Sequence, residues 1–412
     1  MEITWDLLKK LNNKYGESFY LLDSHKFEEN YKEFIKVFRD IYPNTFVAYS
    51  YKTNYIPKLC KIINSYGGYA EVVSEMEYDL ATRIGVLPKN VIFNGPYKTE
   101  AVMEIILLGG GIVNLDSFYE IDIVEKIAKN NLNVNISVGI RCNFKLSRSG
   151  ASRFGFDVDG DELSQAISKL RKINNVNIAG LHCHYPNRNI ESFTYRVDEM
   201  VNLSKKYFSL PPKFIDLGGG YFGKMSRSLK DQFDFDVPSY KEYAEKIATK
   251  FKLFYQDIDD AAKPKLILEP GTALAADTVK FVTRVINIKT IGNKKIATVS
   301  GSKYNISPTL NDKNLPINIY RDLNDCSAEE YEAIDIAGYT CIEHDYLYKD
   351  YKGRLEIGDY VVFDNAGSYS FVLKPPFIMP NFAIIEYDFK EDKAEIIKRK
   401  EESNDIFKTF IF

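Results

Sequence analysis

The segment Phe46-Val-Ala-Tyr-Ser-Tyr-Lys52-Thr53 is a short apolar run that ends beside a lysine, and seven comparable runs follow it before residue 275. Segments such as Ser74–Ile84 and Ser117–Lys129 separate these runs and mix apolar with charged residues at helical spacing. Alternating strands and helices predict a parallel sheet, and eight such units predict closure into an α/β fold of the (β/α)8 TIM-barrel type. An open, doubly wound sheet is the alternative. The eight predicted strands are Phe46–Thr53, Tyr69–Ser74, Val91–Pro96, Gly111–Ser117, Asn133–Asn143, Ile178–Tyr185, Lys213–Tyr221 and Lys265–Gly271.

The pattern changes near residue 278, where runs rich in β-branched residues are separated by Gly, Pro, Asn and Asp. We therefore predict three parts: residues 1–30 packing on a β domain, a barrel of residues 31–277, and a mostly antiparallel β domain of residues 278–412. The charged run Lys390–Lys400 is predicted to form a solvated edge hairpin or a tail. The predicted strands of the β domain are Val279–Thr290, Lys294–Ser300, Tyr360–Asp364, Ser368–Leu373 and Asn381–Tyr387.

The composition argues against several classes of protein. The net charge over 412 residues is −3, so no basic field favours binding to nucleic acid or to an anionic membrane. We identify no N-terminal signal peptide and no apolar run of about 18 residues that would span a membrane. The five cysteines are odd in number and widely spaced, which fits neither a disulfide framework nor a zinc site. We therefore expect a cytoplasmic protein without a bound metal.

In a (β/α)8 barrel the chemistry lies at the carboxyl ends of the strands, so the polar residues there are candidates for the site. Lys52 ends the first predicted strand and Glu269 ends the eighth. A lysine in this position is either a surface residue that reaches water or an amine held for Schiff-base chemistry. A carboxylate that follows the apolar run Leu266–Leu268 needs a partner, which is either a neighbouring polar group or the protonated nitrogen of a pyridine ring.

Two further motifs lie at predicted strand ends. Gly218-Gly-Gly220 follows the seventh strand, and three glycines allow backbone N–H groups to approach an anion such as phosphate. His182 and His184 alternate at the end of the sixth strand and therefore face the same side. Alternating histidines can bind zinc, but no third ligand of suitable spacing follows. The remaining alternatives are an imidazole stacked on an aromatic cofactor and a histidine that belongs to the core.

Together these motifs resemble those of the fold-type III pyridoxal-5′-phosphate (PLP) decarboxylases, the group that holds diaminopimelate, ornithine and arginine decarboxylases beside alanine racemase. The matching segments occur in the family's order and extend from residue 46 to about residue 370. They are Tyr49-Ser-Tyr-Lys52-Thr-Asn54, Glu71-Val-Val-Ser-Glu-Met-Glu-Tyr78, Ile92-Phe-Asn-Gly-Pro-Tyr-Lys98, Asn114-Leu-Asp-Ser117, Arg153-Phe-Gly155, Gly180-Leu-His-Cys-His184, Asp216-Leu-Gly-Gly-Gly220, Glu269-Pro-Gly271, Gly338-Tyr-Thr-Cys341 and Ala366-Gly-Ser-Tyr369.

The resemblance implies a binding site for PLP. Lys52 would carry the cofactor as a Schiff base, His184 would stack on the pyridine ring, and Glu269 would pair with the ring nitrogen. Arg141 matches a family arginine near the cofactor. The residues that would bind the phosphate are Gly218, Gly219 and Gly220, through their backbone N–H groups, and Tyr369 of the β domain.

The resemblance also implies a homodimer with shared active sites. Cys341 would come from the partner subunit and would protonate the carbanion that remains after CO2 leaves. Glu343 and Asp345 lie close to it in the sequence and are the candidates for contacts with an amino-acid substrate. From the residues alone, the simpler interpretation of Cys341 is a small buried hydrophobic side chain. The charged residues next to it favour the other interpretation, a reactive thiol.

Several positions depart from the family pattern. The decarboxylases usually place an acidic residue after the catalytic cysteine, where this chain has Ile342. The family's Gly-Ser after the stacking histidine is replaced by Tyr185-Pro-Asn187, and its arginine after Glu-Pro-Gly is replaced by Thr272. Arg153 takes the place of a lysine, which is a mild change. Because these changes concentrate at the substrate end, they argue against a standard diaminopimelate or L-ornithine decarboxylase.

The expected activity is PLP-dependent α-decarboxylation of an amino acid or an amino-acid conjugate. Alanine racemases of this fold pair the ring nitrogen with arginine, so a glutamate at position 269 favours the stronger electron sink that decarboxylation needs. A PLP-dependent racemase or epimerase that uses Lys52 as a base is the alternative. A regulatory homologue without catalysis ranks lower, because such a protein would be expected to lose cofactor residues that this chain retains.

Overall fold

The computed structural model describes residues 3–146, 152–306, 308–310, 312–322 and 329–412. The chain forms two compact units, and each contains segments that are far apart in the sequence. The barrel unit consists of Glu28–Phe222 and Val237–Leu274. The β unit consists of Met1–Phe27, Gly223–Asp236 and Ala275–Phe412.

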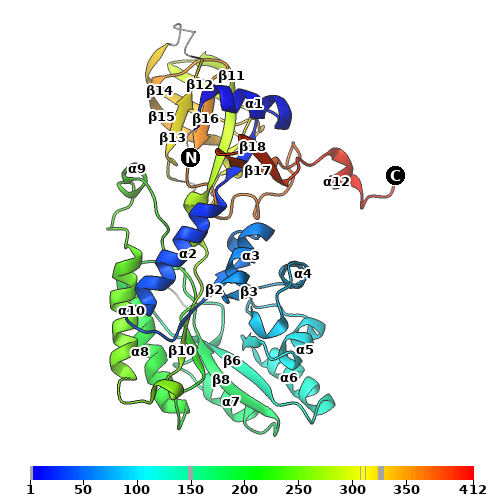
Figure 1. Cartoon of the computed structure of the whole chain (residues 1–412), viewed down its shortest axis with the longest axis vertical. Helices are drawn as coiled ribbons and strands as arrows, with labels where there is room; N and C mark the ends of the chain where they lie inside the picture. The colour runs from blue at the N-terminus through cyan, green and yellow to red at the C-terminus, as the bar shows by residue number, and fades with distance from the viewer. Residues whose placement is uncertain (1–2, 147–151, 307, 311, 323–328) are drawn as a thin grey trace. The chain divides into compact units, whose positions relative to one another are not determined.

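The barrel unit is built on eight parallel strands that close on themselves (Figure 1), so the predicted (β/α)8 fold is confirmed. Strand β5 pairs with β6, and β10 pairs with β2, which leaves none of these eight strands at an open edge. A ninth short strand, β7 (Phe156–Asp157), adds to β6 alone. The eight strands are β2 (Thr45–Ser50), β3 (Tyr69–Val72), β4 (Val91–Phe93), β5 (Ile112–Leu115), β6 (Ile136–Asn143), β8 (Val176–His182), β9 (Phe214–Asp216) and β10 (Lys265–Leu268).

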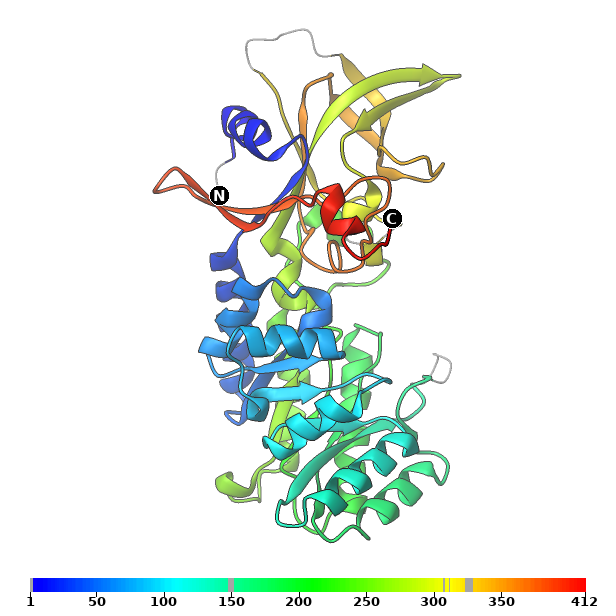
Figure 2. The ribbon, with the colours of Figure 1, turned by 90° about the vertical axis from the view of Figure 1, so that its right-hand side faces the viewer.

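Helices surround the strands of the barrel unit (Figure 2). Several begin at a short polar residue that accepts a backbone N–H of the first turn, as Ser74 does from Glu77 and Asn189 does from Ser192. Such caps stop the preceding loop and fix where the helix starts. The main helices are α2 (Ser24–Arg39), α3 (Pro57–Ser65), α4 (Glu75–Arg83), α5 (Glu100–Leu108), α6 (Phe118–Asn130), α7 (Glu162–Leu170), α8 (Ile190–Tyr207) and α10 (Tyr240–Phe254).

Apolar side chains from five of the barrel strands form a cluster inside the barrel, comprising Ala48, Ile92, Ala179, Phe214 and Ile267. Glycine at position 180 makes room for the largest of them, since a Cβ there would lie 2.5 Å from the Phe214 carbonyl oxygen and 2.6 Å from its ring. This packing fills the barrel interior, as barrels of this size require.

The β unit is a mixed, mostly antiparallel sheet in the order β15-β14-β12-β11-β1-β17-β18, with β16 paired to β11 and β13. Its N-terminal strand β1 lies between β11 and β17, antiparallel to the first and parallel to the second. Strands β17 and β18 form an edge hairpin, as predicted for the charged run Lys390–Lys400. The strands are β1 (Phe19–Leu22), β11 (Val279–Ile291), β12 (Lys294–Val299), β13 (Ile317–Tyr320), β14 (Glu330–Ala337), β15 (Tyr346–Arg354), β16 (Tyr360–Phe363), β17 (Ala383–Asp388) and β18 (Lys393–Lys398).

One predicted strand of this unit is wrong. Residues Ser368–Leu373 form bends and turns instead of a strand. Tyr369 has φ +62°, in the left-handed region that an extended strand cannot contain, and the backbone N–H of Leu373 donates to the Tyr369 carbonyl at 3.3 Å. The sequence prediction also missed β13, β14 and β15, which are only partly buried.

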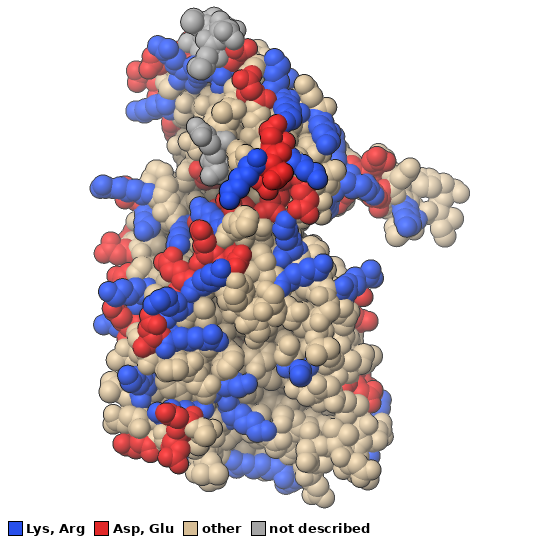
Figure 3. Space-filling model, viewed as in Figure 1, with Lys and Arg blue, Asp and Glu red and all other residues tan. Residues whose placement is uncertain are grey.

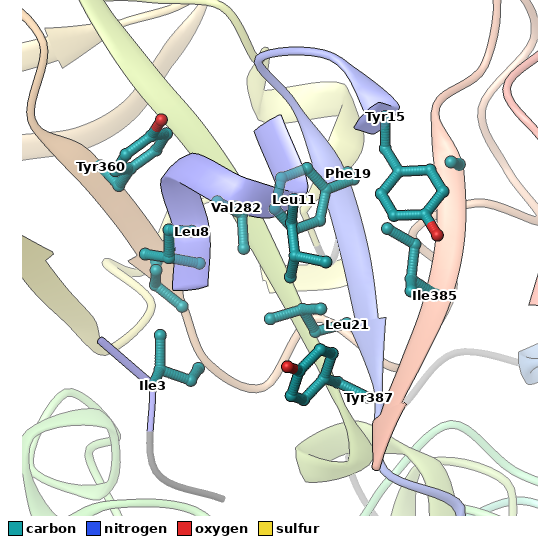
Figure 4. Packing of buried hydrophobic residues seen from close by; sticks show 12 residues of the cluster. Ile3, Leu8, Leu11, Tyr15, Phe19, Leu21, Val282, Tyr360, Ile385 and Tyr387 are labelled. Carbon is teal, nitrogen blue, oxygen red and sulfur yellow. The ribbon is translucent and has the colours of Figure 1, made fainter. Parts of the chain in front are cut away.

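Helix α1 (Trp5–Tyr15) packs its buried face onto the sheet of the β unit (Figure 4). Leu8 and Leu11 of this helix belong to one buried cluster with Leu21 of β1 and Val282 of β11. Thr4 caps the helix by accepting the backbone N–H of Leu7 at 3.2 Å. The N-terminal segment is therefore part of the hydrophobic core of this unit.

On the face shown in Figure 3, lysine and arginine side chains are interspersed with aspartate and glutamate. In the described part of the chain, no helix has the length and apolar character needed to cross a membrane.

Replacing Leu21 by alanine should lower the free energy of unfolding of the β unit by roughly 2–5 kcal/mol, because it leaves a cavity in a strand with neighbours on both sides. Denaturant unfolding followed by tryptophan fluorescence measures the change, since the single tryptophan, Trp5, packs against the same cluster. Leu373→Ala, at a residue 58% exposed, is the control and should change the stability by no more than about 0.5 kcal/mol. Equal effects of the two substitutions would contradict this account of the core.

Candidate active site

The carboxyl end of strand β2 presents Lys52. This residue lies in the single 3-10 turn Tyr51–Thr53 that directly follows the strand. Its ammonium Nζ lies 2.5 Å from Glu71 Oε2, at the adjacent strand β3, and 3.4 Å from Ser50 Oγ. The lysine side chain is 30% exposed, whereas the Glu71 side chain is fully buried. Lys52 is therefore oriented by a buried ion pair instead of extending freely into solvent.

Glu71 and Asn94 were not among the predicted site residues. The Ser50 hydroxyl donates to Glu71 Oε2 at 2.6 Å, and the Asn94 amide donates to Glu71 Oε1 at 3.1 Å. The same Asn94 Nδ2 donates to Glu269 Oε1 at 2.5 Å, and its Oδ1 accepts from Asn114 Nδ2 at 2.8 Å. One buried amide therefore connects the carboxylate of Glu71, in β3, with that of Glu269, which follows β10.

Glu269 is buried at the end of β10 between polar groups from several strands. Its Oε1 lies 3.4 Å from His182 Nε2, and its Oε2 lies 3.8 Å from His184 Nδ1. Burial alone would raise the pKa of Glu269, but the His182 imidazole and the Lys52 ammonium outweigh that effect and hold the pKa below its usual range. The carboxylate is thus anionic in a buried position, which is the state needed to pair with a protonated ring nitrogen.

Burial also controls the other titratable groups at this end of the barrel. It lowers the pKa of His182 and, together with the Lys52 charge, lowers the pKa of His184 well below its usual value, so both imidazoles are neutral at pH 7. Burial and the Glu269 charge raise the pKa of Asp216 well above its usual value. His182, Asp216 and Glu269 bring potential metal-ligand atoms within 4.8 Å of one another. The raised pKa of Asp216 disfavours the ionised carboxylate that a metal ion would need, so this trio is poorly suited to a cation.

The glycine run after β9 approaches the neighbouring backbone very closely. A Cβ on Gly218 would lie 2.4 Å from the Cys183 carbonyl oxygen, and a Cβ on Gly219 would lie 2.6 Å from the Glu269 carbonyl oxygen. The N–H of Gly218 donates to Asp216 Oδ1 at 2.9 Å, and the N–H of Gly219 donates to His184 Nδ1 at 3.0 Å. Two of the three N–H groups predicted to bind phosphate therefore donate to side chains of the protein. For the Gly220 N–H, the described residues provide no acceptor.

The bond from Gly219 fixes the tautomer of His184. Because Nδ1 accepts a hydrogen bond, the proton of the neutral ring is on Nε2. The predicted stacking residue is thus held in one orientation by the same loop that was predicted to bind phosphate.

Arg141 lies at the carboxyl end of β6 and is buried. Its Nη1 lies 3.2 Å from Asp116 Oδ1, and its guanidinium lies 4.6 Å from the centre of the Phe154 ring. The ion pair and the aromatic contact hold the Arg141 side chain in place near the carboxyl ends of the strands.

The remaining predicted residues belong to the β unit. Cys341 and Glu343 are exposed, and Tyr369 is partly buried. Asp345 is buried, and its carboxylate accepts hydrogen bonds from Ser302, Lys303 and Thr340 at 2.6–3.2 Å. Asp345 is therefore engaged in holding its own loop, whereas Glu343 is exposed.

The barrel residues fit a pyridine-based aldehyde cofactor with a phosphate group. The site offers one primary amine at Lys52, one buried carboxylate at Glu269, one flat neutral imidazole at His184 and a backbone cradle that any Cβ would fill. These groups match, in turn, an aldehyde, a ring nitrogen, a ring face and an anion.

Glu77, the third residue of α4, should make the unfolding free energy of the protein depend measurably on pH. Burial and the charge of Glu71 raise its pKa from 4.5 to about 7. Below pH 4.5 the group is protonated in both the folded and the unfolded chain, and from there to pH 7 the folded state binds more protons, so stability falls as the pH rises. Relative to Glu77→Gln, the wild type should lose about 3 kcal/mol of unfolding free energy across this window.

Denaturant unfolding of both proteins at half-unit pH steps measures this difference. Glu75→Gln removes an exposed carboxylate from the same turn of α4 and should leave the pH profile of the wild type unchanged. A difference between wild type and Glu77→Gln that stays constant with pH would show that Glu77 titrates normally.

Comparisons with known proteins agree with the geometry of the site. Residues 25–276 match the family described as "pyridoxal-dependent decarboxylase, pyridoxal binding domain". The chain is 26% identical to a diaminopimelate decarboxylase of Aquifex aeolicus, over 96% of this chain and 91% of that protein. It is 27% identical to an L-glutamyl acyl-carrier-protein decarboxylase of Niallia circulans, over 97% of this chain and 95% of that protein.

Solved structures show the same fold. A diaminopimelate decarboxylase of M. jannaschii in complex with L-lysine matches with a TM-score of 0.85 at 23% identity, over 98% of this chain and 94% of that one. An arginine decarboxylase of Paramecium bursaria Chlorella virus matches with a TM-score of 0.75 at 20% identity, over 92% of this chain and 98% of that one. With a lysine, an anionic glutamate and a glycine cradle at the strand ends of this barrel, and with more than half of its length matching the pyridoxal-binding domain, the chain belongs to the fold-type III PLP-dependent amino-acid decarboxylases.

Proposed function

We propose that this protein removes the α-carboxylate of an amino acid or of an amino-acid conjugate, with PLP held on Lys52. The observation that carries the proposal is the pairing of Lys52 with a buried acid while a second buried acid, Glu269, stays anionic on the adjoining strand β10. When bound, PLP supplies a sink for the electron pair that remains when CO2 leaves the α-carbon.

The residues of this chain prepare the site for that step. Glu71 Oε2 holds the Lys52 amine at the end of β2, where the lysine can attach the cofactor and exchange a proton with the incoming substrate amine. Glu269, whose pKa is held below its usual range, would pair with the protonated nitrogen of the pyridine ring. His184, fixed by Gly219, would cover one face of the ring and would limit the entry of water from that side.

The charge at position 269 favours decarboxylation over the alternative, racemisation or epimerisation. A carboxylate at this position would keep the nitrogen of a bound PLP ring protonated and would thereby strengthen the electron sink that the cofactor supplies for the loss of CO2. Racemisation needs only the removal and return of a proton and does not require as strong a sink.

We further propose that two copies of the chain share their active sites and that Cys341 of one copy protonates the α-carbon in the other. Cys341 is exposed, as a donor to a partner's site must be, and Glu343 lies two residues beyond it with its carboxylate in solvent. Asp345 would act on the substrate only indirectly, since its carboxylate holds the loop. The other described cysteines are buried and unpaired, and we place the protein in the reducing cytoplasm.

The substrate class follows from the same loop. Ile342 offers no charge to a distal ammonium group, whereas Glu343, one position later, is an exposed acidic residue. The relatives act, by their names, on diaminopimelate and on L-glutamyl acyl-carrier protein. We propose that the substrate is not free diaminopimelate. It is either an amino acid with a different side chain or an amino acid attached to a carrier.

The first test is whether Lys52 carries the cofactor. Wild-type protein with PLP should show visible absorbance, and borohydride followed by peptide mapping should place the label on Lys52. Lys52→Met should lose the band and the label, whereas Lys61→Met, at an exposed position on α3, should keep both. A wild-type protein that stays colourless with PLP would rule out decarboxylation and racemisation together and would leave a regulatory role.

The second test follows CO2 release and optical rotation during incubation with free amino acids, diaminopimelate in its stereoisomers, and carrier-bound glutamate. Release of CO2 in proportion to substrate loss is the expected result. Loss of optical rotation without CO2 would contradict decarboxylation and would establish the racemase alternative.

The shared site predicts complementation between two inactive variants. Lys52→Met and Cys341→Ala should each have little activity, whereas an equimolar mixture should recover about a quarter of the wild-type rate, because half of the random dimers have one intact site of two. Steady-state assays before and after mixing, with subunit exchange checked by native mass spectrometry, measure this. Exchange without recovery would show that Cys341 does not serve the partner's site.

A further inference from the structure

A buried guanidinium lies directly behind the glycine loop of the site. Arg196 belongs to α8 and its side chain is completely buried. Its Nη1 donates to the Gly219 carbonyl at 3.0 Å, and its Nη2 donates to the carbonyls of Tyr185 at 3.0 Å and Asn187 at 2.5 Å. Its Nε donates to Ser192 Oγ at 3.2 Å. All of these acceptors are uncharged, so they bind the guanidinium without neutralising it.

In the described part of the chain, no carboxylate lies within ion-pair distance of Arg196. The two nearby acids of the site are committed elsewhere, since Asp216 accepts from Gly218 and Glu269 accepts from Asn94. Arginine remains protonated even when buried, so the barrel contains a buried positive charge without a negative partner. The Phe193 and Tyr185 rings, whose centres lie 4.2 Å and 5.5 Å from the guanidinium carbon, stabilise the charge in part but do not neutralise it. A buried positive charge without a carboxylate partner still favours an anion nearby, and this one therefore points to an anion on the far side of the loop.

The orientation of the Gly219–Gly220 peptide indicates where that anion would bind. In a trans peptide the C=O and the following N–H point in opposite directions, so the N–H of Gly220 points away from the guanidinium that binds the Gly219 carbonyl. Gly220 has φ +102°, a backbone conformation that glycine adopts easily. This conformation presents the Gly220 N–H. A Cβ at Gly220 would lie 3.8 Å from Arg196 Nη2, so only one peptide separates the charge from the cradle.

We propose that Arg196 is the charge that holds the phosphate of the cofactor, acting through the Gly219–Gly220 peptide without touching the phosphate. The guanidinium polarises this peptide, and its positive potential acts on the phosphate dianion at short range in a water-poor site. Arg196 is thus a positioning residue, and it selects the phosphorylated form of pyridoxal over the unphosphorylated form. The proposal rests on the proposed binding of PLP at Lys52.

The decisive quantity is the preference for phosphate, defined as the Kd of pyridoxal divided by the Kd of PLP for the apoprotein. Arg196→Gln removes the charge and keeps an amide donor, whereas Arg196→Lys keeps the charge and loses the fork of donors. We expect the preference to fall at least about tenfold in R196Q and to stay within about threefold of wild type in R196K. The Kd of pyridoxal itself should change little in either variant.

Arg39→Met is the matched control. Arg39 also donates to a barrel carbonyl, that of Thr45 at 2.9 Å, but at the amino end of β2 and far along the strand from Lys52. It should leave both dissociation constants unchanged. Spectral titration of dialysed apoprotein with each ligand, followed by borohydride mapping of Lys52, gives both values.

A second measurement does not depend on the folding of any variant. Inorganic phosphate should raise the melting temperature of wild-type apoprotein above its value in chloride at equal ionic strength, because the anion pairs with the buried charge. No rise in phosphate, or equal losses of pyridoxal and PLP affinity in R196Q, would overturn the role of Arg196. Absence of a Lys52-dependent band in the wild type would instead overturn the proposed function, and the phosphate-induced rise would then still report an anion site.

Discussion

Two buried carboxylates, Glu71 and Glu269, share one amide nitrogen of Asn94, and the arrangement of the site depends on this contact. Two like charges this close repel each other in a medium of low polarity, so each needs a positive or polar partner of its own. Lys52 pairs with Glu71, and His182 and His184 at the end of β8 lie beside Glu269. Asn94 is itself fixed by the Asn114 amide, so three consecutive strands, β3 to β5, each provide a side chain to one network.

The eight barrel strands were predictable because each is a short, nearly continuous apolar run, which is the pattern of a strand buried on both faces. Strands β13, β14 and β15 lack such runs because one side of each meets water. Ser368–Leu373 has the composition of a strand, but the left-handed backbone of Tyr369 interrupts it. Local composition alone could not indicate that turn.

The site was predictable where one residue type at a strand end suggested one chemical role, as for Lys52 and Glu269. Glu71, Asn94 and Asn114 were missed because polar residues of these types are common in any sequence. Their shared role can be recognised only once the pairing of the neighbouring strands brings their side chains together. Arg196 was missed for a different reason. It lies on a helix that carries other charged residues, and the sequence does not show that this one arginine turns inward.

The position of β1 has a consequence for how the chain folds during synthesis. This strand forms from residues 19–22, yet one of its two neighbours, β17, comes from residues 383–388. The sheet of the β unit therefore cannot close until almost the whole chain has left the ribosome, whereas the barrel segment between these strands already has all of its own strands. During that interval the apolar residues of β1 and α1 lack the surface that later covers them. An apolar strand of this kind is prone to associate with other chains until its neighbouring strands have been synthesised.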